Sequence, residues 1–199
     1  MKTIVSIQRA LTLPFKGGQL VYLANLAELN GFLMQQACEA ILLNDFDPPQ
    51  ERLHKLEAEL PFFRIILIEE FSLIDAVLED EAKQEKYSIE RRLTSLRQLT
   101  NKELVQELVN MFINKLSFYS TEFSRVIEAK NSEELSFYSH NLKSSSANLG
   151  ALKLTQVCQY IETISDKKDF LRLKIYVNVI LNEYSKVILY LQNFANSHL

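Results

Sequence analysis

The sequence predicts an α+β chain of two domains, a small α/β domain over residues 1–86 followed by an all-α four-helix bundle over residues 87–199. The first observation behind this prediction is that all four prolines and three of the four glycines lie within the first 61 residues. Because Pro and Gly are costly inside helices, the two parts need different architectures. The second is charge: residues 1–87 hold 8 basic and 14 acidic groups (net −6), whereas residues 88–199 hold 14 and 11 (net +3).

The overall composition excludes several classes of protein. A formal net charge of −3 over 199 residues gives no electrostatic case for nucleic-acid binding. The two cysteines, Cys38 and Cys158, have no metal-ligand spacing, so neither a disulfide scaffold nor a structural zinc site is expected. The most apolar stretch, 62–78, contains three carboxylates, and residues 1–14 show no signal-peptide cleavage site. We therefore expect a cytoplasmic protein that does not cross a membrane.

Short apolar runs alternate with helix-period segments in the first half. The runs at 3–7, 19–24, 39–44 and 63–68 predict strands, and the segments at 26–37 and 48–60 predict helices. This alternation is typical of a small, mostly parallel sheet. The last two runs are apolar on both faces, as buried parallel strands are. The segment 71–86, free of Pro and Gly, predicts a connecting helix that continues toward the bundle.

The second half carries helix starts at regular places. Thr100 with Glu103, and Asn131 with Glu134, have the spacing of an N-cap and a residue that reaches back to it. We expect helices at 88–98, 101–129, 132–149, 151–164 and 168–196. The two longest carry apolar residues at helical period: Leu104, Leu108, Met111, Phe112, Leu116, Tyr119 and Phe123 in one, and Ile175, Val179, Tyr184, Ile188 and Leu191 in the other. Joined by short turns, such helices form a four-helix bundle.

One histidine is predicted to face solvent from the helix at 132–149. Leu135, Leu142 and Leu149 recur every seven residues and form the core stripe, and His140 points about 140 to 160° away from it. The side chains expected beside it on the exposed face are Ser136, Phe137, Lys143, Ser144 and Ala147. An exposed neutral imidazole is a good nucleophile, although a solvent-facing His with a Lys three residues later is by itself an ordinary helix surface.

The residues around this histidine carry a longer pattern. The string HNLKSSSANLGA begins at His140 and is followed by Leu154, Cys158 and the pair Ile161-Glu162. It closely resembles the histidine-containing phosphotransfer (HPt) family, whose pattern is H-x-L-K-G-S-S-x-x-L-G-A followed by L-x-x-x-C-x-x-L-E. The resemblance covers roughly residues 90–199, where the bundle is independently predicted.

The resemblance implies a phosphorelay carrier that is not itself an enzyme. His140 would take a phosphoryl group from the aspartate of one receiver domain and pass it to another, Lys143 would offset the phosphoryl charge, and Glu162 would bind the other ring nitrogen. The implied partners are the receivers of a hybrid histidine kinase and of a response regulator. The metal for transfer would come from the receiver, so we expect this chain to hold no metal and no other cofactor. Nothing resembles an ATP lid or a P-loop, so autophosphorylation from ATP is not expected.

Two features leave alternatives open. Ser144 replaces the family's usual Gly after the lysine, which predicts a changed docking face on which Phe137 is the candidate anchor. The alternative function is therefore an adaptor that binds and sequesters a receiver without transfer. Asp45 follows a predicted strand as a receiver's acceptor aspartate does, but the first strand lacks the acidic pair that binds magnesium. Residues 1–86 are thus interpreted as a degenerate receiver-like domain, with a sheet of unrelated origin as the alternative.

Overall fold

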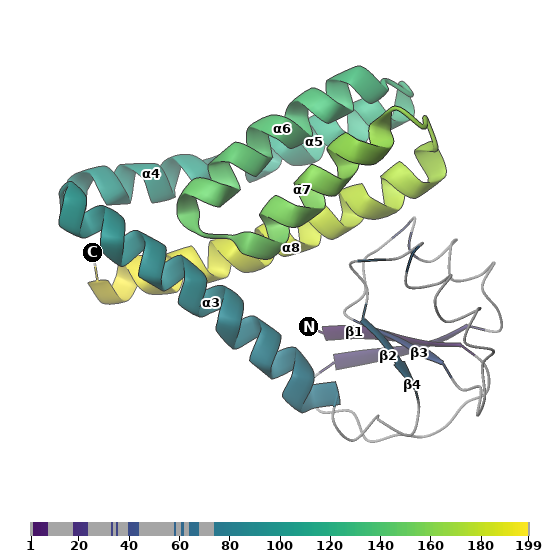
Figure 1. Cartoon of the computed structure of the whole chain (residues 1–199), viewed down its shortest axis with the longest axis horizontal. Coiled ribbons are helices and arrows are strands. Elements are labelled where there is room, and N and C mark those ends of the chain that lie inside the picture. Colours follow the sequence, from purple (N-terminus) through teal and green to yellow (C-terminus); the bar gives the residue numbers. More distant parts are fainter. Residues whose placement is uncertain are drawn as a thin grey trace. The chain divides into compact units, whose positions relative to one another are not determined.

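The chain folds as two compact units, Met1–Glu81 and Ala82–Leu199 (Figure 1). The computed structural model describes residues 2–7, 18–23, 33, 35, 40–43, 58, 61, 64–67 and 74–198. The predicted helices at 26–37 and 48–60 lie almost entirely outside these residues, and so does Asp45. Among the described helices, none is long and apolar enough to span a bilayer.

The first unit contains a four-stranded sheet. Its strands are β1 (Lys2–Ile7), β2 (Gly18–Leu23), β3 (Ala40–Leu43) and β4 (Arg64–Leu67), and they lie at the four apolar runs named above. Their order in the sheet is β2-β1-β3-β4, and every neighbouring pair is parallel. In this register Ile4 lies opposite both Leu20 and Ala40. Because parallel neighbours need crossover connections, the chain returns to the same end of the sheet after each strand.

The second unit is helical. The helices are α3 (Ile74–Leu99), which begins in the first unit, α4 (Lys102–Asn114), α5 (Leu116–Glu128), α6 (Ser132–Leu149), α7 (Leu152–Ser165) and α8 (Phe170–His198). The helices α5 to α8 pack as a four-helix bundle, and α4, which precedes α5 in the chain, lies along α8 (Figure 1). The five residues expected on the core face of α8 are all buried.

The boundaries of α3 and the start of α4 differ from the prediction. The expected helices at 71–86 and 88–98 form one continuous helix, α3, because no residue between them stops a helix. The predicted N-cap Thr100 is wrong. Its hydroxyl donates to the Leu96 carbonyl at the end of α3, while the Asn101 side chain accepts from Leu104 N–H at 2.8 Å and begins α4. Either residue suits an N-cap, and the spacing to Glu103 favoured the wrong one.

The predicted helix at 101–129 is broken at Lys115. The Phe112 carbonyl accepts the Lys115 N–H at 3.2 Å and also the hydroxyl of buried Tyr184, from α8, at 2.6 Å. The rings of Phe112 and Tyr184 lie 4.5 Å apart. A side chain that enters the hydrogen-bond ladder of a helix is a recognised cause of a kink. The break therefore comes from a contact 72 residues away in sequence, which no local pattern shows.

The buried face of α4 also differs from the prediction. The side chains of Leu104, Leu108 and Met111 are 41%, 38% and 51% exposed, and Val105 and Val109 lie in the core in their place. Phe112 is buried as predicted. Both rows are apolar and have helical spacing, and they lie about 100° apart on the helix. Periodicity alone could not choose between them.

We predict that Tyr184→Phe lowers the free energy of unfolding by about 1 kcal/mol, because it removes a buried hydrogen bond without changing the packing of the ring. Urea unfolding followed by circular dichroism measures the change. The matched control is Tyr87→Phe, since the Tyr87 side chain is 65% exposed on α3. Equal stability of the two variants would contradict the explanation of the helix break.

Candidate functional site

The helix that carries His140 is defined at both ends by local interactions. At its start, the Asn131 side chain accepts from Glu134 N–H at 3.1 Å and donates to the Glu134 carboxylate at 2.8 Å. At its end, Gly150 adopts a left-handed conformation with φ of 78°. The predicted range of 132–149 is confirmed.

The buried face of α6 alternates leucine and serine. Leu135, Leu142 and Leu149 are buried as predicted, and three serines share their face: Ser132, Ser139 and Ser146. The Ser146 hydroxyl donates to the Leu142 carbonyl at 2.7 Å, which satisfies its polar group without a partner helix. Small side chains on this face let α7 pack closely, and α6 and α7 form the most extensive helix pair of the bundle. The opposite face holds His140, whose side chain is 62% exposed.

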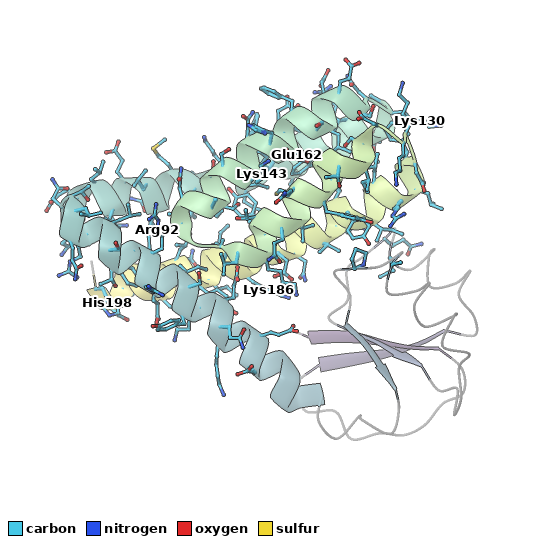
Figure 2. The ribbon with its side chains drawn as sticks, in the orientation of Figure 1. Arg92, Lys130, Lys143, Glu162, Lys186 and His198 are labelled. Atoms are coloured by element: carbon cyan, nitrogen blue, oxygen red, sulfur yellow. The ribbon has the colours of Figure 1, made fainter. Side chains whose placement is uncertain are left out.

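Three predicted site residues lie together. Glu162, on α7, faces α6, where Lys143 Nζ donates to Glu162 Oε2 at 2.7 Å (Figure 2). The same oxygen lies 3.4 Å from His140 Nδ1. One carboxylate oxygen therefore contacts both the lysine and the histidine, and the shorter contact is to the lysine.

The surroundings of the Glu162 carboxylate determine which of its two oxygens makes the polar contacts. Lys143 and Glu162 side chains are only 24% and 20% exposed, so their ion pair is screened less than a surface pair. Glu162 Oε1 is buried and has no hydrogen-bond partner among the described residues. The Oε2 atom thus makes the polar contacts of this carboxylate. An acceptor facing Nδ1 favours the imidazole tautomer with its proton on Nδ1, which leaves the lone pair on Nε2.

The residues predicted for a docking face surround His140 on α6. Phe137, Ser144 and Ala147 are exposed, and Ser136 is half-buried. The Ser144 hydroxyl donates to the His140 carbonyl at 3.1 Å, so it is held against its own helix. The hydroxymethyl group of Ser144 therefore changes the docking face by its bulk more than by its hydrogen bonding.

An aromatic residue that the sequence did not single out lies near this face. Phe118, on α5, is 50% exposed and packs edge-on against Tyr138, which in turn packs edge-on against Phe137. The ring centroids are 5.9 and 5.5 Å apart. Because the next residue, Tyr119, points into the core, Phe118 lies on the outer face of α5. The sequence could have shown this only if the break at Lys115 were known.

Cys158 is a core residue of α7, as predicted, and its side chain is buried one turn before Glu162. Burial raises the pKa of the Cys158 thiol well above its ordinary value, the nearby Glu162 charge raises it further, and Lys143 lowers it. The thiol is therefore neutral at physiological pH.

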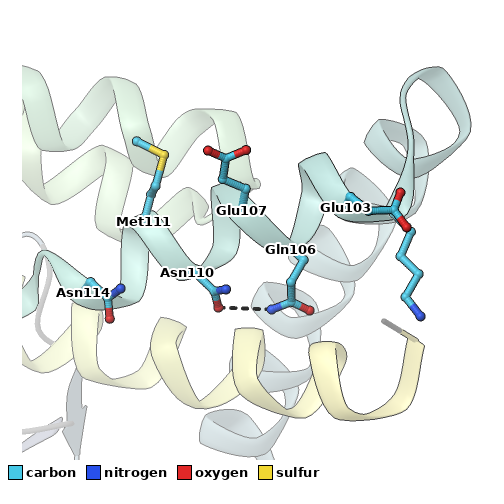
Figure 3. Close-up of a pocket in the computed structure, with 7 residues that line it drawn as sticks. Glu103, Gln106, Glu107, Asn110, Met111 and Asn114 are labelled. Atoms are coloured by element: carbon cyan, nitrogen blue, oxygen red, sulfur yellow. Dashed lines mark hydrogen bonds between the residues drawn. The ribbon is translucent and has the colours of Figure 1, made fainter.

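An open hollow lies along α4, apart from the residues around His140 (Figure 3). Its lining comes entirely from that one helix: Lys102, Glu103, Gln106, Glu107, Asn110, Met111 and Asn114. Gln106 donates to the Asn110 side chain at 3.1 Å. No predicted site residue lines it.

Comparison with known proteins finds a family model that matches part of the chain. Residues 89–174 match the family model described as Hpt domain, and the match includes His140, Lys143 and Glu162. The Hpt match thus lies within the helical unit of the chain. The Hpt match leaves out residues 1–88, so the receiver-like interpretation of the first unit gains no support from it.

The helical fold also resembles a solved structure. The crystal structure of histidine-containing phosphotransfer protein B (HptB) from Pseudomonas aeruginosa PAO1 matches with a TM-score of 0.51 and 19% sequence identity. The match covers 55% of this chain and 94% of that one. At this identity the likeness concerns the fold. A search of curated proteins finds no match.

We predict that native Cys158 reacts with iodoacetamide at pH 8 on the order of 100-fold more slowly than an exposed cysteine, because its neutral thiol is reached only through local opening. The measurement uses a Cys38→Ser background and follows alkylation by mass spectrometry. Adding Gln159→Cys, at the exposed neighbouring position, supplies the fast-reacting control. Equal rates at the two positions would show that α7 does not bury this thiol.

Proposed function

We propose that this protein is a phosphorelay carrier in which His140 receives a phosphoryl group from the aspartate of one receiver domain and delivers it to another. The observation that carries the proposal is an exposed imidazole within the Hpt match whose Nδ1 faces the Glu162 carboxylate at 3.4 Å. Lys143, one turn further along α6, supplies a positive charge beside it.

The proposed step is a displacement at phosphorus. The Nε2 lone pair of His140 attacks the phosphorus of the aspartyl phosphate, an N–P bond forms, and the P–O bond to the aspartate breaks. The aspartate leaves as a carboxylate, and the proton on Nδ1 stays directed at Glu162 Oε2. The reverse step on a second receiver breaks the N–P bond. The acidic pocket of the receiver supplies the magnesium ion, so this chain needs no metal of its own.

Lys143 and Glu162 have complementary roles in this step. Glu162 favours the reactive tautomer and stabilises the positive charge that develops on the ring during attack. Lys143 offsets the added negative charge of the phosphoryl group. The Lys143 ammonium contacts Glu162 Oε2 at 2.7 Å, and the lysine lies one helical turn from His140 on α6.

The partners we propose are the receiver domains of a hybrid histidine kinase and of a response regulator. They would dock on the face that carries Ser136, Phe137, Ser144 and Ala147, where exposed aromatic surface adjoins the polar site. Phe137 is the proposed anchor, because its side chain is 61% exposed and supported by Tyr138.

For the first unit we propose a degenerate receiver-like domain without phosphoryl transfer of its own. The strand order β2-β1-β3-β4 supports the likeness, since flavodoxin-like doubly wound sheets have the order 2-1-3-4-5. The first strand, KTIVSI, offers no acidic residue for a magnesium ion, and Asp45 would therefore lack the cation that neutralises an incoming phosphoryl group.

We predict that a phosphorylated cognate receiver labels the wild-type protein at an acid-labile, base-stable site, and that His140→Gln abolishes the label because the nucleophile is gone. Radiolabel transfer on a gel measures this. His198→Gln is the matched control, since His198 is exposed near the end of α8. Equal labelling of wild type and His140→Gln would exclude the carrier. Tight receiver binding by wild type with no labelling would favour the sequestering adaptor.

We predict that Ser144→Gln weakens receiver binding by about tenfold, because a long side chain enters the docking face. The free energy of unfolding should change by no more than about 0.5 kcal/mol, since the position is exposed. Calorimetric titration and thermal unfolding measure the two quantities. The control is Ser124→Gln on α5, where an exposed serine hydroxyl also donates to a carbonyl four residues back, at 2.8 Å. Equal receiver affinity of the two variants would move the docking face away from Ser144.

A further inference from the structure

The start of α7 is capped by a residue from another helix. The N-cap position of α7 is Ala151, which has no side-chain oxygen to cap the free N–H groups. The Glu85 carboxylate of α3 instead accepts the Lys153 N–H, with its two oxygens 3.2 and 3.3 Å away. Glu85 lies upstream of the residues that match the Hpt domain. A carboxylate at the N-terminus of a helix also interacts favourably with the helix dipole.

The same segment of α3 holds the end of α6. Arg92 Nε donates to the Asn148 carbonyl at 3.1 Å, in the last turn of α6 (Figure 2). Between these two contacts, the turn itself touches α3: a Cβ atom on Gly150 would lie 2.8 Å from the Ser88 carbonyl oxygen and 2.9 Å from Arg92 Cβ. Three contacts from residues 85–92 of α3 thus hold both sides of the connection between α6 and α7.

The first turn of α7 is also held from α8. Lys153 Nζ lies 3.4 Å from the carboxylate of buried Glu183, which Lys186 Nζ contacts at 2.9 Å. Burial raises the pKa of Glu85, and the hydrogen bond from Lys153 N–H lowers it. The Lys153 backbone and side chain therefore meet carboxylates of two different helices, so α7 begins at a fixed place between α3 and α8.

The orientation set at this turn affects the geometry at His140. His140 lies ten residues before Gly150 and Glu162 twelve after it, or about 15 and 18 Å along the two helices. A tilt of about 4° between α6 and α7 would move these side chains apart by about 1 Å. The distance from Nδ1 to Oε2 is already 3.4 Å, so such a shift would lose the contact.

From these contacts we infer that Glu85 and Arg92 are positioning residues for phosphoryl transfer: by holding the turn between α6 and α7, they keep Glu162 within reach of His140. The inference rests on the proposed function of His140. It assigns a role in the reaction to α3, the helix by which the first unit is joined to the Hpt domain.

The test compares Glu85→Ala, Arg92→Ala and the double variant with two matched controls in the full chain. Glu90→Ala and Arg91→Ala remove the same charges from the same helix, where Glu90 is half-buried and pairs with Lys86 at 3.6 Å, and Arg91 is exposed. Two quantities are measured: the rate of transfer from a phosphorylated receiver, and the fraction of neutral His140 with its proton on Nδ1, from 15N NMR of the unphosphorylated protein. A change of tautomer reports on the Glu162 contact and not on stability alone.

The double variant should transfer about tenfold more slowly and lose the preference for the Nδ1 proton, while both controls match wild type. Glu85→Gln should retain most of the rate, because its amide oxygen can still accept the Lys153 N–H. If Glu85→Ala fails to fold, Arg92→Ala alone decides, since it removes one exposed hydrogen bond.

Wild-type rate and tautomer in the folded variants would overturn the inference. If wild type itself receives no phosphoryl group, the proposed function fails, and the NMR measurement still decides whether α3 positions Glu162.

Discussion

The site depends on one carboxylate oxygen that two residues of the neighbouring helix share. Glu162 Oε2 contacts Lys143 Nζ at 2.7 Å and faces His140 Nδ1 at 3.4 Å. Because Glu162 comes from α7 and the other two residues from α6, this arrangement exists only while the two helices keep their register. A half-buried ion pair stabilises that register and places a cation beside the exposed imidazole. Because the carboxylate faces Nδ1 of the His140 ring, the proposed reaction takes place at Nε2.

The rest of the bundle maintains this pair of helices. The serines on the inner face of α6 permit close packing, Gly150 permits a turn with positive φ, and α3 and α8 hold the first turn of α7 through Lys153. His140, Phe137 and the other residues of the proposed docking face lie on the other, exposed side of α6, where they can contact a partner.

Local signals predicted the site helix well and the helices before it poorly. Asn131 and Gly150 define α6 by interactions within a few residues, so its range and the exposure of His140 could be predicted. The break at Lys115 depends on Tyr184, and the choice between the Leu104 and Val105 rows depends on where α8 packs. Sequence pattern also could not show that Glu162 lies closer to Lys143 than to His140, or that Glu85 caps α7. These are contacts between residues distant in sequence.

The proposed geometry at His140 is tested most directly by identifying the ring nitrogen that carries the phosphoryl group. Two-dimensional 31P and 15N NMR of the phosphorylated protein distinguishes the two isomers of phosphohistidine. Since Glu162 faces Nδ1, we expect phosphorylation of His140 at Nε2, with the proton retained on Nδ1. Phosphorylation at Nδ1, or at a residue other than His140, would contradict it.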